Sequence, residues 1–301
     1  MRYPSFVLGL LIVAAASTGV VIAADEQPLT MAAVLEAASK SDWVELPQED
    51  LLYLELASGT VVFELAHEFA PRHIGNLKTL TGDRYFDGLA ITRVQDNYVV
   101  QWGDPQAGTD AARTYGDAAE IMQPEFYRSS EGLELSPIDS RDAYADTVGF
   151  VSGFPAGSDG ERTWLAHCYG MLGTGRATAA NSGSGAELYI VSGHAPRHLD
   201  RNVTLLGRTV YGIEHLSMLP RGTGEMGFYE TEAEQVPITH MRFGNDLPSD
   251  KQVKLERLRT STSTFEQLVE ARRNRLEEWF VDPAGNIELC NVPLPVRELS
   301  D

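Results

Sequence analysis

Apolar and polar residues alternate on both sides of Ser58 and Gly59, and this alternation restricts the fold of the chain more than any other feature. Over 51–66, LLYLELASGTVVFELA, it predicts two strands joined by a tight turn. Further short strand-like runs follow, bounded by turn-forming residues, with two helices predicted at 69–81 and from Tyr211 onward. Many short strands with such turns favour a closed β-barrel or a β-sandwich.

The strand-rich region, 50–248, carries additions at both ends and in its middle. Residues 25–49 predict a polar linker and a short helix. Residues from about 105 to 166 are rich in Gly, Asp, Ser and Pro, so we expect a loop-dominated insertion with a few strands or turns. Residues 249–301 predict an amphipathic helix, TFEQLVEARRNRLEEWF, and a closing hairpin around 283–285. This helix could pack on the chain's own strands or present a surface to a partner.

Residues 1–24 predict a secretory signal peptide. MRYPS carries one positive charge, FVLGLLIVAAASTGVVIA is apolar, and the small residues around Ala23 suit cleavage. The apolar run is also about long enough to span a bilayer, so an uncleaved membrane anchor is the alternative. We expect cleavage and export. The periplasm is the expected destination, and secretion from the cell is the alternative.

The acidic balance of the chain argues against two classes of partner. Its formal charge is −19, and removal of the signal segment takes away one arginine and no acid. Nucleic acid and anionic lipid are both polyanions, so such a surface opposes binding to either. We therefore expect no nucleic-acid partner, no membrane contact beyond the signal segment, and a monomer.

The two cysteines, Cys168 and Cys290, would meet an oxidising environment after export. A disulfide between them would close a long loop and stabilise the fold by a few kcal/mol, roughly. Two separate buried thiols are the alternative, and the sequence favours neither arrangement.

Two polar side chains, Arg93 and Gln101, interrupt an apolar strand-like run, ITRVQDNYVVQWGD. Their even spacing places both on one face of an extended strand. A face of the core would not normally hold an arginine and a glutamine together. We therefore expect this face to line a groove.

Four segments carry a resemblance to a known family: VVFELAHEFAPRHIGNL, ITRVQDNYVVQWGD, ELYIVSG and HLDRNVTLLGRTVYG. Their order and spacing resemble those of the cyclophilin-type peptidyl-prolyl isomerases. The residues that match the family pattern in the second segment are Arg93, Val94, Gln101, Gly103 and Asp104. Tyr98 stands where the family has Phe, Val99 where it has Met, and Thr92 where it has His.

The later segments match with further substitutions. Tyr189 takes the place of the pocket Phe, and Glu187 replaces a Gln. His198 and Leu199 stand for Trp-Leu, and Val203 lies where a His often does. The run GTGRATAANSGSGA, with Gly175 and Arg176, resembles the Met-Ala-Arg loop of the bacterial, exported branch.

The resemblance implies a mainly β fold: a closed antiparallel cyclophilin-like β-barrel with two capping helices, the insertion and the C-terminal helix and hairpin being additions to it. It also implies catalysis of cis/trans exchange at X–Pro bonds of unfolded or extended polypeptides, which assists folding. Arg93 would donate a hydrogen bond to the proline nitrogen in the twisted state, and Gln101 would hold the substrate carbonyl or orient Arg93. The residues expected to bind substrate are Tyr98, Val99, Gly175, Arg176, Glu187, Tyr189, His198 and Leu199.

Bond rotation needs no cofactor, and we expect no metal site. His194 and His198 are four residues apart, but Pro196 between them opposes the helix that such a metal pair would need. Two alternatives stay open: a catalytically weak cyclophilin-like module or chaperone of the cell envelope that only binds peptides, and a structural envelope protein that docks through its C-terminal extension. Arg93 could also form a plain structural ion pair.

Overall fold

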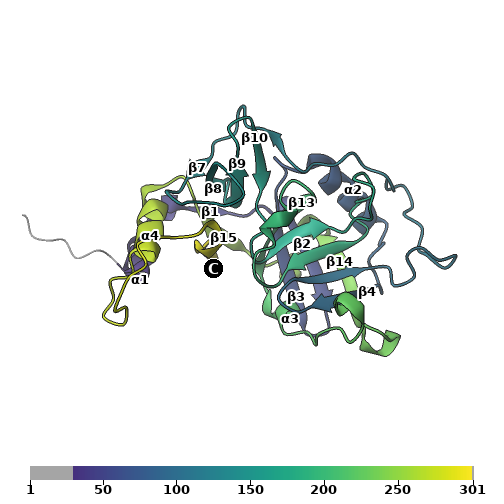
Figure 1. Ribbon diagram of the computed structural model, residues 1–301. Helices are drawn as coiled ribbons and strands as arrows, with labels where there is room; N and C mark the ends of the chain where they lie inside the picture. The colour runs from purple at the N-terminus through teal and green to yellow at the C-terminus, as the bar shows by residue number, and fades with distance from the viewer. Residues whose placement is uncertain (1–29, 300–301) are drawn as a thin grey trace, which may run out of the picture.

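The structure, a computed structural model, describes residues 30–299 (Figure 1). The predicted signal peptide, residues 1–24, lies outside the described residues. Within 30–299, no helix combines the length and the apolar character that a membrane span requires.

Eight antiparallel strands close into a barrel, which confirms the predicted fold class. In order around the barrel the strands are β11 (Met171–Thr174), β12 (Leu188–Val191), β5 (Val99–Gly103), β4 (Ala90–Gln95), β14 (Val236–Phe243), β2 (Leu51–Leu56), β3 (Gly59–Leu65) and β13 (Leu205–Tyr211). The predicted hairpin is β2 with β3, in the register Leu56 to Gly59. Gly59 has a φ of 142°, and a Cβ at this position would collide with the ring of His215, so glycine is required here.

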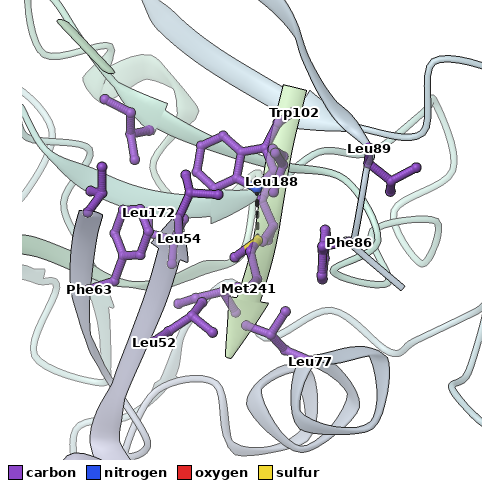
Figure 2. Packing of buried hydrophobic residues seen from close by; sticks show 14 of the residues in the cluster. Leu52, Leu54, Phe63, Leu77, Phe86, Leu89, Trp102, Leu172, Leu188 and Met241 are labelled. Carbon is purple, nitrogen blue, oxygen red and sulfur yellow. Dashed lines mark hydrogen bonds between the residues drawn. The ribbon is translucent and has the colours of Figure 1, made fainter. Parts of the chain in front are cut away.

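The barrel is filled by large apolar side chains (Figure 2). Alternate residues of β2 and β3, among them Leu52, Leu54 and Phe63, point inward and are fully buried. Trp102 packs against Phe63 with ring centroids 6.0 Å apart, and its Nε1 donates to Met241 Sδ at 3.3 Å. Each such side chain contributes roughly 1.5–3 kcal/mol through burial, so this cluster is the main source of barrel stability.

Two helices add apolar residues to the same core. The helix α2 (Pro71–Gly82) begins with proline in its first turn and buries Ile74, Leu77 and Leu80 at helical spacing. The second helix, α3 (Glu214–Ser217), is a single turn that buries Leu216.

The insertion consists mostly of loops with a few short strands, as expected, but the sequence did not predict that these strands form one sheet. Five short strands form one antiparallel sheet within it, in the order β6 (Arg128–Ser129), β10 (Arg162–Leu165), β9 (Phe154–Ser158), β8 (Thr147–Val151) and β7 (Ser136–Pro137). Gly149 explains part of this difference, because its missing side chain lets the backbone of Ser136 and Pro137 approach too closely for a Cβ. Small residues at such contacts weaken the alternating pattern that identifies a strand.

The two chain ends pack together beside the barrel. The terminal sheet has the order β1 (Trp43–Glu45), β15 (Leu255–Leu258) and β16 (Val296–Glu298), so the first strand of the chain is paired with one near its end. The helix α1 (Met31–Ala37) contacts α4 (Ser263–Arg273). The helix was predicted up to Phe280, but α4 ends at Arg273. The hairpin expected around 283–285 was wrong, because these residues form no strand and β16 pairs with β15 instead.

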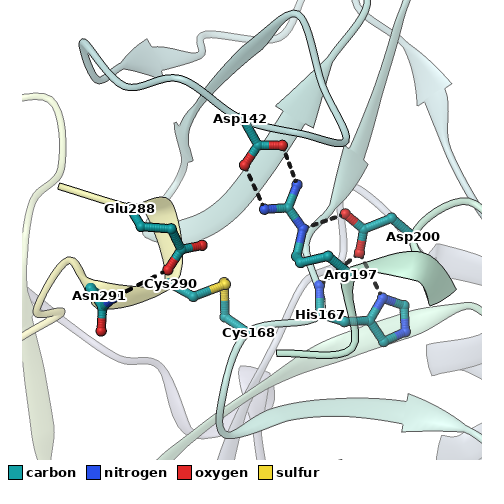
Figure 3. The surroundings of a disulfide bond; sticks show 8 residues. All are labelled: Asp142, His167, Cys168, Arg197, Asp200, Glu288, Cys290 and Asn291. Carbon is teal, nitrogen blue, oxygen red and sulfur yellow. Dashed lines mark hydrogen bonds and ion pairs between the residues drawn. A yellow bond between two sulfur atoms is a disulfide. The ribbon is translucent and has the colours of Figure 1, made fainter. Parts of the chain in front are cut away.

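The N-terminal, inserted and C-terminal additions share one apolar cluster with the outer face of the barrel. Phe150 of the insertion meets Phe265 of α4 with ring centroids 5.2 Å apart. Cys168, just before β11, is joined by a disulfide to Cys290 of the C-terminal extension, with a Cα–Cα distance of 5.0 Å (Figure 3). In Figure 1, helices α1 and α4 and the sheet of the insertion lie to the left of the barrel. The additions are therefore tied to the barrel by packing and by a covalent bond.

Candidate active site

Arg93 and Gln101 lie on one face, but not for the reason that the sequence suggested. The run from 90 to 103 is a hairpin rather than one strand, with Arg93 on β4 and Gln101 on β5 as direct cross-strand partners. A turn at Asp96 and Asn97 reverses the chain, and Asn97 adopts a φ of 53°. Directly opposed residues of an antiparallel pair share a face, so the predicted juxtaposition is present although its predicted geometry was wrong.

The guanidinium of Arg93 is held by three acceptors. Its Nε donates to the carbonyl oxygen of Met226 at 2.8 Å, and its Nη1 donates to Gln101 Oε1 at 2.9 Å. Its Nη2 donates to Gln95 Oε1. Each terminal nitrogen keeps a second N–H, because a guanidinium has five in a planar fork. Arg93 is therefore fixed in position and still able to donate.

Two aromatic rings flank the same guanidinium. Its central carbon lies 5.7 Å from the ring centroid of Tyr98 and 5.1 Å from that of Phe228. Both are distances at which a cation is attracted to a ring. Burial lowers the pKa of Arg93, an effect that Tyr98 and Glu187 oppose. An arginine nevertheless stays protonated in proteins, so the side chain remains a charged donor.

Glu187 fixes the orientation of the Gln101 amide. Gln101 Nε2 donates to Glu187 Oε1, so its oxygen is left to accept from Arg93. Gly175 permits this arrangement, because a Cβ there would lie 2.9 Å from Glu187 Cδ. Burial raises the pKa of the Glu187 carboxyl, and Gln101 and the charge of Arg93 partly oppose that shift. A carboxylate thus stands at the edge of the groove where the family has a neutral amide.

The groove itself has a volume of about 290 Å³. Its lining residues are Arg93, Tyr98, Val99, Gln101, Thr174, Gly175, Arg176, Tyr189, Leu199 and Val203. The structure therefore brings together all the residues that the sequence singled out except Glu187 and His198. Glu187 contacts Gln101 at the edge, whereas His198 is exposed and does not line the groove.

Arg176 lies at one end of the groove and is largely committed to the loop that carries it. Its Nε donates to the carbonyl of Asn202 at 2.8 Å, and its Nη1 donates to that of Ala177 at 2.9 Å. Its central carbon lies 5.8 Å from the ring centroid of Phe126, which belongs to the insertion. Arg176 therefore shapes the groove end rather than offering a free fork to a substrate.

The sequence analysis missed the segment 221–230, which packs along β4 next to Arg93. The N–H of Gly222 donates to the carbonyl of Val94 and that of Tyr229 to the carbonyl of Thr92, both at 2.9 Å. This places the carbonyl of Met226 and the partly exposed ring of Phe228 beside the guanidinium. The signal available in the sequence was an apolar pair, Met226 and Phe228, in the glycine-rich run RGTGEMGFYE.

The arrangement suits chemistry that needs no nucleophile. A charged, fixed donor stands over an apolar floor formed by Tyr98, Val99, Tyr189 and Leu199. Among residues 30–299, no three His, Cys, Asp or Glu side chains gather as metal ligands would. Such a site can bind an apolar ring and stabilise developing electron density on an atom above it.

Comparisons with known proteins agree with this geometry. The family described as cyclophilin type peptidyl-prolyl cis-trans isomerase/CLD matches residues 51–243. A probable peptidyl-prolyl cis-trans isomerase of Brucella suis is 32% identical over 100 residues, which are 29% of this chain and 51% of that protein. The isomerase ppi1 of Schizosaccharomyces pombe is 37% identical over 65 residues, which are 21% of this chain and 42% of that protein. The chain thus spans about half the length of the curated relatives it matches, or less.

A solved structure resembles most of the chain. The crystal structure of the cyclophilin AquaCyp293 from Hirschia baltica has a TM-score of 0.66 and 20% sequence identity. The match covers 87% of this chain and 97% of that one, so the likeness extends beyond the length that the family model matches. Together with the family match over more than half of its length, these findings show that the chain belongs to the cyclophilin-type peptidyl-prolyl cis-trans isomerase family.

Proposed function

We propose that this protein is a peptidyl-prolyl cis-trans isomerase that acts on X–Pro bonds of exported client proteins and so assists their folding. One observation carries the proposal: Arg93 is fixed by three acceptors over an open apolar groove. Family membership supports it. The clients are unfolded or extended chains that contain proline, and the protein works as a monomer.

The residues of the groove have separate parts in this reaction. Rotation about the peptide bond costs about 18–20 kcal/mol, because the resonance of the C–N bond is lost. In the twisted state the proline nitrogen becomes pyramidal and accepts a hydrogen bond, which Arg93 donates. Tyr98, Val99, Tyr189 and Leu199 hold the ring, so that the preceding carbonyl swings while the ring stays bound. Because the guanidinium of Arg93 is already oriented, its N–H group stabilises the transition state more than the ground state.

The test is the exchange rate of a generic Ala-Pro peptide, measured by NMR with catalytic amounts of the mature protein. Wild type should accelerate exchange, and Arg93→Ala should lose about 10²-fold of that rate, the usual cost of one transition-state donor. Arg259→Ala is the matched control, because Arg259 is an exposed arginine that follows β15 and is not among the residues that line the groove. No acceleration by wild type, even at high concentration, would refute the activity.

Export to the periplasm is part of the same proposal. The apolar run within residues 1–24 supports it, and so does the Cys168–Cys290 disulfide, since such bonds persist in oxidising compartments. Mass spectrometry of fractionated cells should find a chain that begins near Asp25 in the periplasmic fraction. A full-length chain in the membrane fraction would favour the anchor, and a reduced chain in the cytoplasm would contradict export.

The second candidate is a peptide-binding module or chaperone without useful catalysis. It is favoured by the carboxylate of Glu187 at the groove edge and by the absence of a tryptophan at His198. Coverage of Arg93 and Gln101 by the insertion would also have favoured it, but no residue of 105–166 is among those that line the groove. Peptide binding by wild type without faster exchange would select this candidate.

A further inference from the structure

A chain of buried polar groups runs from the insertion to the wall of the groove, and Figure 3 shows its members from Asp142 to His167. Asp142 of the insertion receives two hydrogen bonds from Arg197, at 2.8 and 3.1 Å. Arg197 Nε donates to Asp200 Oδ2 at 2.6 Å, and Asp200 Oδ1 lies 2.9 Å from His167 Nδ1. His167 Nε2 then lies 2.9 Å from the hydroxyl of Tyr189, which lines the groove.

The chain is closed to solvent over its length. The side chains of Asp142 and Arg197 are each 4% exposed, that of Asp200 is 2% exposed, and that of His167 is fully buried. Buried polar groups that are fully paired restrict one another to a single arrangement. Each member is therefore held by its neighbours, and a change at one end can reach the other.

The protonation states of the side chains determine which atom donates in each hydrogen bond of the chain. Burial lowers the pKa of His167, against the influence of Asp200, so the ring is neutral. Burial alone would raise the pKa of Asp200, but hydrogen bonds and charge from His167 and Arg197 lower it, so it is a carboxylate and can only accept. His167 Nδ1 must then carry the proton and Nε2 must accept, which makes Tyr189 the donor.

The hydroxyl of Tyr189 is therefore directed into the protein and not into the groove. Its ring lies nearly parallel to that of His167, with centroids 6.4 Å apart and planes 9° apart. Gly173 provides the space, because a Cβ there would lie 2.5 Å from the Tyr189 hydroxyl. Leu199, on the same wall, lies between Arg197 and Asp200 in one short turn. Two wall residues are thus anchored by the same chain of polar groups.

We propose that Asp142 and Arg197 are positioning residues for the groove, through which the insertion sets the placement of Tyr189 and Leu199 and hence the affinity for proline. This inference rests on the proposed function, because it assigns the groove to proline. It gives the insertion a part in substrate binding although no insertion residue lines the groove.

The first measurement is the dissociation constant of an Ala-Pro peptide, by NMR titration, together with the exchange rate. Asp142→Asn keeps the shape of the side chain and removes its charge, while Arg197 retains its hydrogen bond to Asp200. We expect peptide binding to weaken about tenfold, with the exchange rate at saturation changed less than twofold. Asp87→Asn is the matched control, because Asp87 forms an equally bidentate pair with Arg242, both bonds at 2.7 Å, outside the groove.

The second measurement asks whether the effect passes through Tyr189. Tyr189→Phe removes the hydroxyl that meets His167, so Asp142→Asn should have little further effect on peptide binding in that background. Equal losses with and without the hydroxyl would overturn the route through His167 and Tyr189 and assign the effect to Leu199 alone. Wild-type affinity in Asp142→Asn itself would overturn the proposal.

The third measurement needs no substrate and separates the two proposals. Nitrogen-15 chemical shifts of His167 in the free protein should show a neutral ring protonated at Nδ1 from pH 7 to 8. A ring that titrates in this range, or that is protonated at Nε2, would overturn the network whatever the protein's activity. A neutral Nδ1–H ring and weakened binding in Asp142→Asn, in a protein that does not accelerate exchange, would refute the isomerase alone.

Discussion

Glu187, at the edge of the groove, is the residue whose chemistry departs most clearly from the family pattern. Its carboxylate orients Gln101 and lies close enough to Arg93 to affect that residue's pKa. A glutamine at this position could orient its amide either way, whereas a carboxylate can only accept. The substitution therefore fixes one orientation of Gln101 and adds a negative charge to the edge of the groove.

Glu187 should make the enzyme prefer basic over acidic residues next to proline. Two charges several ångströms apart near a protein surface interact by about 1 kcal/mol or more, so Glu187→Gln should raise the rate for Glu-Pro relative to Lys-Pro peptides several-fold. Exchange rates of the two peptides at pH 8 would measure this. Because the pKa of Glu187 is raised, the preference should already weaken at a pH where an ordinary glutamate is still ionised.

Glu266→Gln controls for the overall charge, since it removes the same charge from the exposed face of α4. It should leave the ratio of the two rates unchanged. An equal shift in both variants would assign the preference to the net charge of the protein and not to Glu187.

Single residues of the site could be predicted where the chemistry was unusual for its surroundings. Arg93 and Gln101 stood out as polar groups in an apolar run, and their shared face follows from the hairpin. Met226 and Phe228 could not be found in this way, because their place beside Arg93 depends on a loop that packs from 133 residues further along the chain. His198 matched the family by position, but its turn directs it to solvent.

At the scale of elements, the insertion secures the start of helix α2. Glu125 accepts hydrogen bonds from the backbone N–H of Arg72 at 3.2 Å and of His73 at 3.0 Å, and it contacts both side chains. A carboxylate at a helix N-terminus satisfies donors that have no partner within the helix. Burial alone would raise the pKa of Glu125, but the hydrogen bonds from His73 and Arg72 lower it to about 2.

This depressed pKa predicts a loss of stability in acid. The contribution of Glu125 is fully present above its ordinary pKa of 4.5 and is lost as the pH falls from there to about 2. Since the side chain is buried, the contribution at pH 7 is about 2–3 kcal/mol, as an order of magnitude. Urea unfolding should show Glu125→Gln to be less stable than wild type at pH 7, and the difference should close toward pH 2.

Glu131→Gln is the matched control, because Glu131 is an exposed glutamate of the same insertion. It should unfold like wild type at each pH. If the difference in the free energy of unfolding between Glu125→Gln and wild type stayed constant from pH 7 to pH 2, the assigned role would be contradicted.

Elements were predictable where a regular pattern covered several residues. The β2–β3 hairpin and helix α2 follow from alternation and helical spacing, and both are present. The sheet of the insertion was missed because its strands are short and contain Gly149 and Gly157, which break the pattern. The pairing of β15 with β16 was missed because a helix and a long irregular segment separate the two strands.

At the scale of the whole molecule, the disulfide should contribute much of the free energy that holds the C-terminal extension against the barrel. It joins residues 122 positions apart, and the loop-entropy account gives about 4–5 kcal/mol for a loop of this size. The double variant Cys168→Ser, Cys290→Ser should therefore lower the free energy of unfolding by about 2–5 kcal/mol, as measured with urea.

Reductant provides the internal control for this prediction. It should destabilise wild type and leave the double variant unchanged. Hydrogen exchange should show faster opening of α4 and β16 than of the barrel strands. Unchanged stability of the double variant would mean that packing alone holds the two units together.

The pairing of Trp43 with Leu258 has a consequence for how the molecule is made. The terminal sheet cannot assemble until β15, near the end of the polypeptide, is available, so the segment that contains Trp43 stays unpaired until then. A chain stalled or shortened before residue 255 would leave the outward face of β2, with Leu51 and Tyr53, uncovered. Incomplete copies of this protein would therefore expose apolar side chains and become substrates for chaperones and proteases.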